Sequence, residues 1–401
     1  SRATSREMCL ESMHRWAQLK GITVLGTGDF THPAWFNELK NKLEPAEPGL
    51  FRLKKELAAT ADTDVPESCR AEVRFMLSAE VSCIYRRADK TRKVHHLLYA
   101  PDLDAAARIN ADLARIGNIA SDGRPILGLD SVRLLQFVLA ASPDAHLIPA
   151  HAWTPHFSIF GSASGFDSMD ECFGDLAPHI FAIETGLSSD PPMNRRLSAL
   201  DGIALISNSD AHSPMKLGRE ANLFNTDLSY RAIFDAIKAN DPARFTGTIE
   251  FFPEEGKYHM DGHRACNMRL APTETIRNNG LCPSCGKPVT VGVMHRVEKL
   301  ADRPEGKQPA GLLRHRPAVP LTEIISEVLD VGESSKAVAK EYAKLLATFG
   351  NEFAILLEIP LADISKGGFP LIADAIGKMR KGEVEVDPGY DGVFGRVRVK
   401  P

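Results

Sequence analysis

The chain has 401 residues, a formal net charge of −4, 43% hydrophobic residues and 25% charged residues. This composition is ordinary for a folded globular protein of two or three domains and argues against wholesale disorder. No apolar run approaches the roughly 20 residues that cross a bilayer, so we expect no membrane partner. The small negative charge leaves room for a local basic surface. Seven cysteines without a signal peptide favour a reducing, cytoplasmic location.

The first 250 residues alternate between predicted helices and strands. A capping box, with Thr4 at the N-cap and Glu7 three residues later, predicts a helix over 5–20. This cadence, without a glycine-rich nucleotide fingerprint, favours right-handed βαβ units closed into a parallel barrel. Strands are predicted at 22–25, 74–81, 93–99, 145–150, 179–183, 203–207 and 246–252, and helices at 34–43, 102–117, 130–141, 168–174, 192–200, 214–222 and 228–239.

The character of the sequence changes near residue 253, which predicts three domains. Residues 1–252 form the predicted α/β barrel. Residues 253–316 are rich in Gly, Pro, Cys and His and predict a small zinc-binding module. Residues 317–401 predict a small helical C-terminal domain that ends in a β-hairpin over 384–400. Its helices are predicted at 321–329, 335–349 and 370–379.

Acidic and imidazole side chains recur where the predicted strands end. Each one alone has an ordinary explanation as a rim charge, a helix cap or a hydrogen-bonded histidine. In a closed parallel barrel, however, these ends meet at one cavity. A mixed imidazole–carboxylate set favours a multinuclear site for zinc, manganese or magnesium, metals that activate water for phosphoester hydrolysis. The candidate ligands are Asp29, His32, Glu80, His95, His96, His151, Glu184, Asp210 and His212.

Two of these candidates are neighbours in one predicted strand. Because side chains alternate between the two faces of a strand, only one of His95 and His96 can point into the cavity. The sequence leaves the choice between them open.

Three cysteines lie within twenty residues of one another. Cys282 and Cys285 form a C-x-x-C turn, and Cys266 lies sixteen residues upstream of Cys282. This pattern predicts a structural zinc site, whose metal would supply folding energy to a module with little core. A redox pair is disfavoured because the segment that follows is strand-like, and unmetallated thiols are the remaining alternative. The fourth ligand is open among His263, His259 and, with less support, His295.

Residues 286–320 carry seven positive and three negative side chains, a local balance of +4. Most charge runs are solvated faces, but beside a phosphoesterase cavity this one favours a phosphate-binding surface. Two aromatic residues after the 145–150 strand either stack against an extruded base or belong to the barrel rim. The candidate DNA contacts are Lys287, Arg296, Lys299, Arg303, Trp153 and Phe157.

Several motifs give the chain a family resemblance. In order, Gly28-Asp29, Glu80, His151 and the string Ser209-Asp-Ala-His resemble the PHP (polymerase and histidinol phosphatase) superfamily. Longer strings resemble the endonuclease Q family within it. They are HAWTPHFSIFGSASGFDS from residue 151, SNSDAHSP from 207, CPSCGKPVTVGVMHRVEKLADR from 282 and PGYDGVFG from 388.

The resemblance implies a distorted (β/α)7 barrel, a multinuclear metal centre, a zinc-knuckle module and a DNA-repair endonuclease. Family members nick DNA on the 5′ side of uracil, hypoxanthine or xanthine, and at abasic sites. The implied partner is therefore double- or single-stranded DNA with a damaged base, and a helicase or sliding clamp is a further expected partner. The implied catalytic residues are Asp210, His212, Glu80 and His151.

The sequence departs from the superfamily pattern in two places. The usual Thr-Asp-His is Gly28-Asp29-Phe30 here, with His32 as a possible substitute. The His-x-His motif that opens the superfamily barrel is absent from the sequence. We therefore expect a barrel without its first strand, and weaker metal binding.

Two other functions remain open at this point. A PHP phosphatase acting on a small phosphoester, such as histidinol phosphate, would explain the metal residues but not the cysteine cluster or the basic segment. A non-catalytic DNA-binding or helicase-associated module would explain the departure from the pattern.

Overall fold

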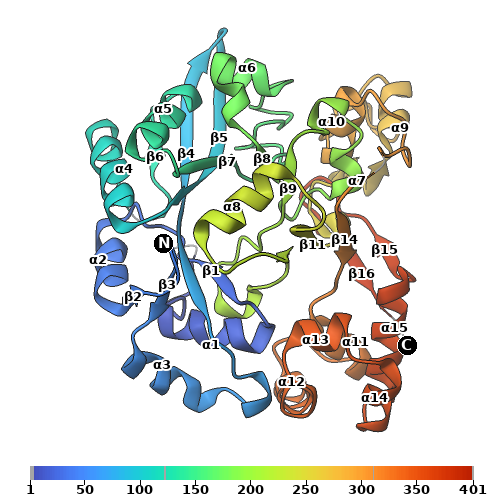
Figure 1. The fold of residues 1–401 in the computed structure, drawn as a ribbon. Helices are drawn as coiled ribbons and strands as arrows, with labels where there is room; N and C mark the ends of the chain where they lie inside the picture. The colour runs from blue at the N-terminus through green and yellow to red at the C-terminus, as the bar shows by residue number, and fades with distance from the viewer. Residues whose placement is uncertain (1–3, 122, 310, 400–401) are drawn as a thin grey trace.

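The computed structural model describes residues 4–121, 123–309 and 311–399 and has a mixed α/β architecture (Figure 1). Helices and strands alternate through the first 250 residues, and helices dominate the last 80. In the described part of the chain, no helix is long and apolar enough to cross a membrane. The mixed α/β class is confirmed, whereas the closed parallel barrel is not what the strands form.

The largest sheet has seven strands and is built on a long hairpin. Its main path runs β2-β3-β4-β5-β7, while β1 and β6 also pair with β4. β1 and β6 lie parallel to β4, but β5 is antiparallel to both β4 and β7. The strands are β1 (Val24–Gly26), β2 (Leu43–Pro45), β3 (Phe51–Leu53), β4 (Arg74–Arg87), β5 (Lys90–Ala100), β6 (Ile126–Leu127) and β7 (His146–Pro149).

The remaining strands form separate small sheets rather than closing the large one. β8 (Ala182–Glu184) and β9 (Ala204–Ile206) form a parallel pair. β11 (Phe245–Glu250) lies between the antiparallel β10 (Ala221–Phe224) and the parallel β14 (Arg314–Pro317). Among the described residues, the strands thus make an open, divided arrangement, because the antiparallel β5 interrupts the expected βαβ order.

Among the described residues before 250, eight helices accompany the strands, and their bounds correct several predictions. Figure 1 shows α2, α4 and α5 along one side of the β4–β5 hairpin. The predicted helices 192–200 and 214–222 shrink to a four-residue α7 and short 3-10 turns. The helices are α1 (Leu10–Lys20), α2 (Pro33–Lys42), α3 (Lys55–Ala61), α4 (Leu103–Ile116), α5 (Ser131–Ala141), α6 (Met169–Phe173), α7 (Pro191–Asn194) and α8 (Tyr230–Ala239).

The first helix begins later than the capping box predicts. Its N-cap is Cys9, and the backbone N–H of Ser5 instead donates to the carbonyl of His212 at 2.7 Å. The Ser5 hydroxyl accepts the N–H of Glu7, so residues 5–8 form a turn before the helix. This long-range hydrogen bond holds residues 5–8 outside the helix, although the capping-box sequence favours a helix there.

Residues 253–316, called the middle module below, consist of short elements. β12 (Asp261–His263) and β13 (Met268–Leu270) are antiparallel, and α9 (Pro272–Arg277) and α10 (Val293–Leu300) lie nearby (Figure 1). The domain boundaries at 252/253 and 316/317 stay predictions.

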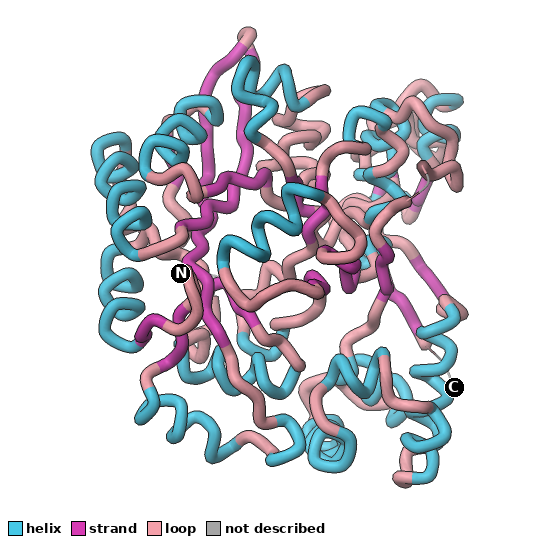
Figure 2. Tube along the Cα trace, in the orientation of Figure 1, coloured by secondary structure: helices cyan, strands magenta, loops and turns pink. Residues whose placement is uncertain are grey.

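Between residues 320 and 399, the described residues form five helices and a hairpin. The predicted hairpin is confirmed, since β15 (Glu385–Asp387) pairs antiparallel with β16 (Arg396–Arg398). Figure 2 shows the helices gathered at one lower corner of the molecule, apart from the large sheet. They are α11 (Leu321–Leu329), α12 (Lys336–Phe349), α13 (Glu352–Leu357), α14 (Leu361–Lys366) and α15 (Pro370–Lys381).

A buried ion pair joins the first helix to these C-terminal helices. Lys20 Nζ lies 2.6 Å from Oε2 of Glu352, and the two side chains are 2% and 3% exposed. The hydroxyl of Tyr342 donates to the same carboxylate at 2.7 Å, and the N–H of Leu321 donates to its other oxygen at 3.1 Å. Buried charges require such paired and hydrogen-bonded surroundings.

Candidate metal centre

One carboxylate and two imidazoles meet beside the β4–β5 hairpin. Glu80 lies in β4, His95 lies in β5, and His151 follows the end of β7. Ser82 pairs with His95 in the hairpin register, so Glu80 and His95 are diagonal neighbours on one face of the sheet. Strand pairing therefore places the three side chains together even though they are far apart in the sequence.

The ligating atoms of this trio form a tight triangle. His95 Nδ1 lies 2.9 Å from Glu80 Oε1 and 3.0 Å from His151 Nε2, and the third side, from His151 Nε2 to Glu80 Oε1, is 3.2 Å. An octahedral ion with bonds of about 2.1 Å places adjacent ligand atoms about 3.0 Å apart. The triangle therefore has the dimensions of one face of a metal coordination shell.

Protons alone cannot satisfy all three sides of the triangle. If both imidazole nitrogens carry a proton toward Glu80, two donors face each other at 3.0 Å. If one imidazole donates to the other, the accepting lone pair of the second faces the carboxylate. A cation within reach of all three atoms removes this conflict, so the residues fit a metal ion.

Arg124 is a member of this site that sequence reasoning missed. Its Nη2 lies 2.7 Å from Oε2 of Glu80, and its Nη1 lies 3.3 Å from Nδ1 of His95. Arg124 bonds the carboxylate oxygen that the triangle does not use. It lies in the loop between α4 and β6, where no periodic pattern or motif marks it.

A second layer of polar groups holds His151. Glu184, at the end of β8, accepts the backbone N–H of His151 at 2.7 Å, and its other oxygen accepts the amide of Asn208 at 2.8 Å. The ring Nδ1 of His151 lies 3.1 Å from Oγ1 of Thr154. Glu184 is 3% exposed and lies outside the group of three ligand atoms, where its hydrogen bonds hold His151 and Asn208. Asn208, within the motif around Asp210, is also a missed residue.

Three predicted ligands have a backbone conformation that most side chains avoid. Asp29, His151 and Asp210 have φ values of 46°, 28° and 44°, each just after a strand. Left-handed backbone at such residues stores strain and clusters at functional sites. Gly186 makes room for one of them, because an added Cβ there would lie 2.6 Å from the Cβ of His151.

The close packing of the trio shifts the pKa values of its members in different directions. Burial alone would raise the pKa of Glu80, but hydrogen bonds from His151 and His95 hold it well below its usual range. Burial lowers the pKa of His95 to about 4, despite the neighbouring carboxylate. Burial likewise lowers the pKa of His151, but the bond to Glu80 outweighs it and leaves a raised pKa. His95 is therefore neutral at pH 7, the form that binds metals.

The structure separates the two adjacent histidines. His96 is fully buried on the opposite face, where its Nε2 lies 2.9 Å from the hydroxyl of Ser131 and its ring packs against Phe173. Strand alternation thus selects His95, and His96 leaves the set of candidate ligands.

The remaining predicted ligands lie around the trio but outside the triangle. Burial, followed by the charge of Glu80, raises the pKa of Asp29. The charge of His32 acts in the opposite direction and lowers it. His32 is the N-cap of α2. Asp210 and His212 have 40% and 44% exposed side chains, and His212 Nδ1 lies 2.9 Å from the backbone oxygen of Asp210.

The predicted cysteine cluster is assembled. Among the described residues, ligand atoms of four side chains lie within 4.8 Å of one another. Cys285 Sγ lies 3.4 Å from Nδ1 of His263, whereas Nδ1 of the alternative His295 is 2.7 Å from a carboxylate oxygen of Asp261. The other alternative, His259, is 6% exposed and lies outside the cluster. The four residues are His263, Cys266, Cys282 and Cys285.

Burial raises the pKa of the Cys282 thiol, whereas the backbone N–H groups of Cys285 and Ser284 lower it. The balance places the pKa of Cys282 at about 7. The thiolate, which is the metal-binding form, is therefore readily available.

Two predicted DNA contacts are buried structural residues instead. Arg296 is 6% exposed and donates to the carbonyls of Phe160 and Phe166, besides pairing with Asp167 at 2.6 Å. Trp153 is fully buried, and its indole N–H donates to Asn194 at 2.7 Å. Because their polar groups are used inside the protein, the structure does not present either side chain to DNA, and both contacts stay predictions.

The other candidate contacts differ in their availability. Arg303 pairs with Asp201 at 2.6 Å, while Lys287 and Lys299 are exposed. Phe157 is half-buried beside the trio, with its ring centroid 4.7 Å from that of His95. Lys93 Nζ lies 5.4 Å from the centroid of the same Phe157 ring.

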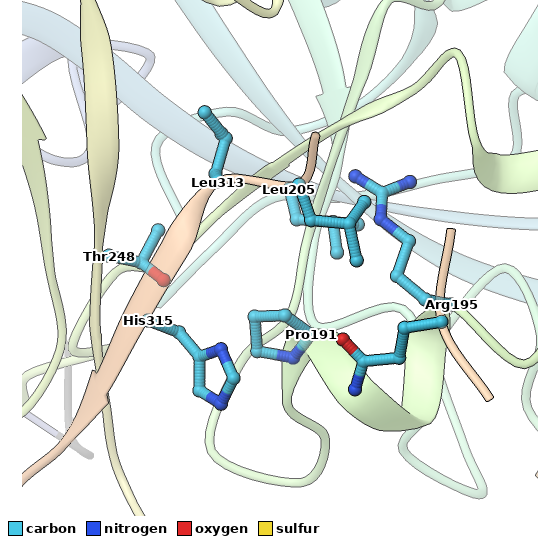
Figure 3. Close-up of a pocket in the computed structure, with 8 residues that line it drawn as sticks. Pro191, Arg195, Leu205, Thr248, Leu313 and His315 are labelled. Carbon is cyan, nitrogen blue, oxygen red and sulfur yellow. The ribbon is translucent and has the colours of Figure 1, made fainter. Parts of the chain in front are cut away.

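A small cavity lies away from the trio and is lined by other residues. Figure 3 shows it between α7, β9, β11 and β14, with Arg195, Thr248 and His315 at its wall. Its volume of about 20 Å³ has room for roughly one water molecule.

Comparisons with known proteins follow the same architecture. The crystal structure of the lesion-specific endonuclease PfuEndoQ from Pyrococcus furiosus is 30% identical, with a TM-score of 0.85, and the match covers 99% of this chain and 92% of that one. A crystal structure of endonuclease Q in complex with a 27-mer duplex that has an abasic lesion at the active site is also 30% identical, with a TM-score of 0.83 and coverage of 99% and 93%. The chain belongs to the endonuclease Q family. This result confirms the resemblance that the sequence motifs indicate.

Two curated relatives extend this endonuclease Q family assignment. The Bacillus subtilis protein YqxK is 30% identical over 386 residues, which are 94% of this chain and 89% of the relative. The Methanocaldococcus jannaschii protein MJ0043 is 32% identical over 263 residues, which are 63% of this chain but only 32% of that longer relative. A family model, the MJ0043 C-terminal domain, matches residues 320–383, the segment that holds α11–α15.

Proposed function

We propose that this chain is a metal-dependent DNA endonuclease of repair type, which nicks 5′ of uracil, hypoxanthine or xanthine, or at an abasic site. The Glu80–His95–His151 triangle carries the proposal, since its geometry suits a metal ion and phosphoester hydrolysis. The family assignment supports it, and one family structure holds a duplex with an abasic lesion.

The residues divide the work in a simple way. Glu80, His95 and His151 would hold zinc, manganese or magnesium, which when bound lowers the pKa of water and neutralises charge on a phosphate. Arg124 adds a fixed positive charge beside Glu80 and is suited to bind a non-bridging phosphate oxygen. Asp210, which is 40% exposed and whose charge acts on His151, is suited to accept a proton from the attacking water.

The finer architectural expectations belong to the same proposal. We assign the strand ends of β1, β7, β8 and β9 to a divergent form of the PHP-type barrel, and the cysteine cluster to structural zinc. The three domain ranges, a helicase or sliding-clamp partner and a cytoplasmic location stay predictions.

A nicking assay tests the function directly. Duplexes with one uracil, hypoxanthine, xanthine or abasic site are incubated with the protein and each of the three metals, beside an undamaged duplex. We expect nicks 5′ of the lesion and none in the undamaged duplex. Cleavage of histidinol phosphate without nicking would instead indicate a phosphatase, and salt-sensitive DNA binding with neither activity would indicate a binding module.

The role of Asp210 has its own matched control. Asp210→Asn should reduce nicking at least about 100-fold while DNA binding persists, because proton transfer contributes roughly that much. Asp227→Asn, at an exposed position after β10, should leave nicking unchanged. Undiminished nicking by Asp210→Asn would remove Asp210 from the mechanism.

A further inference from the structure

The turn between β15 and β16 exposes a large aromatic ring. Phe394 is 71% exposed, the highest value among the large hydrophobic side chains of the described residues. A ring of this size left in water is available to a ligand that can cover its apolar face.

The turn that carries Phe394 is held firmly to the middle module. The carboxylate of Asp391 accepts the backbone N–H of Arg264 at 2.6 Å and the hydroxyl of Thr290 at 2.5 Å. The hydroxyl of the buried Tyr390 donates to Asn267 at 3.0 Å. The ring of Phe394 is thus presented from a fixed base and does not belong to a loose end.

The turn also packs too closely to rearrange easily. A Cβ on Gly395 would lie 2.1 Å from the carbonyl oxygen of Glu254, and one on Gly389 would lie 2.4 Å from that of Gly256. The backbone on both sides of Phe394 is therefore fixed by direct contact with the first residues of the middle module.

Two positive side chains lie near the turn that carries the exposed ring. Lys257 Nζ lies 5.8 Å from the centroid of the Phe394 ring and 5.5 Å from that of Tyr258. The Arg264 guanidinium lies near Gly392, with Nη1 3.5 Å from the place where a Cβ would be. The neighbouring carboxylate of Asp391 keeps its negative charge but accepts hydrogen bonds from the middle module, so Lys257 and Arg264 are the cations left to contact a ligand.

We propose that Phe394 is a stacking platform for an unpaired DNA base, with Lys257 and Arg264 contacting the adjoining phosphates. The inference rests on the proposed function, because it takes DNA as the substrate. Aromatic rings bind every base through its flat face, and a basic rim follows the phosphate backbone, which together suit a single-stranded or unstacked nucleotide. The platform lies outside the metal centre and would position DNA without taking part in the reaction.

Binding of undamaged single-stranded DNA tests this platform apart from the chemistry. The probe is an oligonucleotide that contains 2-aminopurine, whose fluorescence is quenched when it stacks on a ring. Phe394→Ala should weaken binding about 10-fold and remove the quenching, because the base loses the ring on which it stacks. Phe394→Trp should retain both properties. Leu371→Ala removes another exposed apolar side chain (57% exposed) and should change neither.

The outcomes separate this inference from the proposed function. If the unmodified protein binds no DNA, the proposed function fails first. If it binds DNA and Phe394→Ala binds equally well, only the platform is wrong. Loss of binding that Phe394→Trp does not restore, or a change in self-association with intact DNA binding, would also overturn the platform.

Discussion

Nδ1 of His95 lies 2.9 Å from Oε1 of Glu80, although the two residues belong to different strands. The contact follows from the register of the β4–β5 hairpin, in which Ser82 faces His95 and Glu80 is its diagonal neighbour. A shift of one residue would bring His96 to this face and send His95 into the core. The hairpin register therefore decides the composition of the candidate metal centre.

Arg124→Met should lower nicking at least about 10-fold while most bound metal remains. Arg124 bonds Oε2 of Glu80, whereas the metal triangle uses Oε1, so the substitution removes a phosphate contact rather than a ligand. Nicking rates and metal content by mass spectrometry check this expectation. Arg115→Met, at a 77% exposed side chain, is the control. Full loss of metal from Arg124→Met would contradict the separation of roles.

Chelation should destabilise the middle module before the rest of the protein. The His263–Cys266–Cys282–Cys285 group would hold one zinc ion, and such sites supply folding free energy. Cys285→Ser should remove about one equivalent of zinc and lower the melting temperature, while Cys9→Ser changes neither. Zinc content and thermal unfolding are the measurements, and an unchanged zinc content in Cys285→Ser would refute the site.

Lys20→Met should cost about 3–5 kcal/mol in the free energy of unfolding, because it leaves the Glu352 carboxylate buried without its cation. The double variant Lys20→Met/Glu352→Leu should recover part of this loss. Lys344→Met breaks a half-exposed pair and should cost under about 1 kcal/mol. Denaturant unfolding of the three variants provides the comparison, and equal losses for Lys20→Met and Lys344→Met would contradict the expectation.

Two buried glutamates should make the protein less stable as the pH rises. Glu220 and Glu250 adjoin the Ala221–Ile249 pair of β10 and β11, and burial followed by mutual repulsion raises the pKa of Glu220. Burial also raises the pKa of Glu250. A carboxyl group whose pKa is raised in the folded protein contributes its full stability at pH values below the ordinary pKa of 4.5. This contribution is lost as the pH rises through the pKa of the folded protein.

Glu250→Gln should therefore stabilise the protein more at pH 8 than at pH 5, by at least about 1 kcal/mol. Melting temperatures at the two pH values measure the effect, and Glu358→Gln, at an exposed position, should show no such difference. A larger gain at pH 5 would reverse the sign and refute the assignment.

Several parts of the fold were accessible from the sequence because local signals agreed with packing. The helices near 102–117, 130–141 and 335–349 appear within one or two residues of their predicted bounds, each with a capping side chain at its start. The cysteine spacing likewise brought His263 into consideration. These features depend on interactions between residues close together in the sequence, so they can be predicted from it.

Long-range pairing explains most of what the sequence did not reveal. The turn of the β4–β5 hairpin is Ala88-Asp89, both with positive φ, where Asn or Gly is the usual signal. Without that signal, β5 looked like a separate parallel strand. Arg296 and Trp153 show the same limit, since nothing in their local sequence indicates that partners more than 40 residues away bury them.

The Lys20–Glu352 pair has a consequence for the order of folding. Its members are 332 positions apart, so the first helix cannot neutralise its buried lysine until the chain has been synthesised past residue 352. During synthesis on the ribosome, Lys20 therefore stays exposed to water until Glu352 has emerged. Burial of Lys20 against the C-terminal helices is thus a late step in folding.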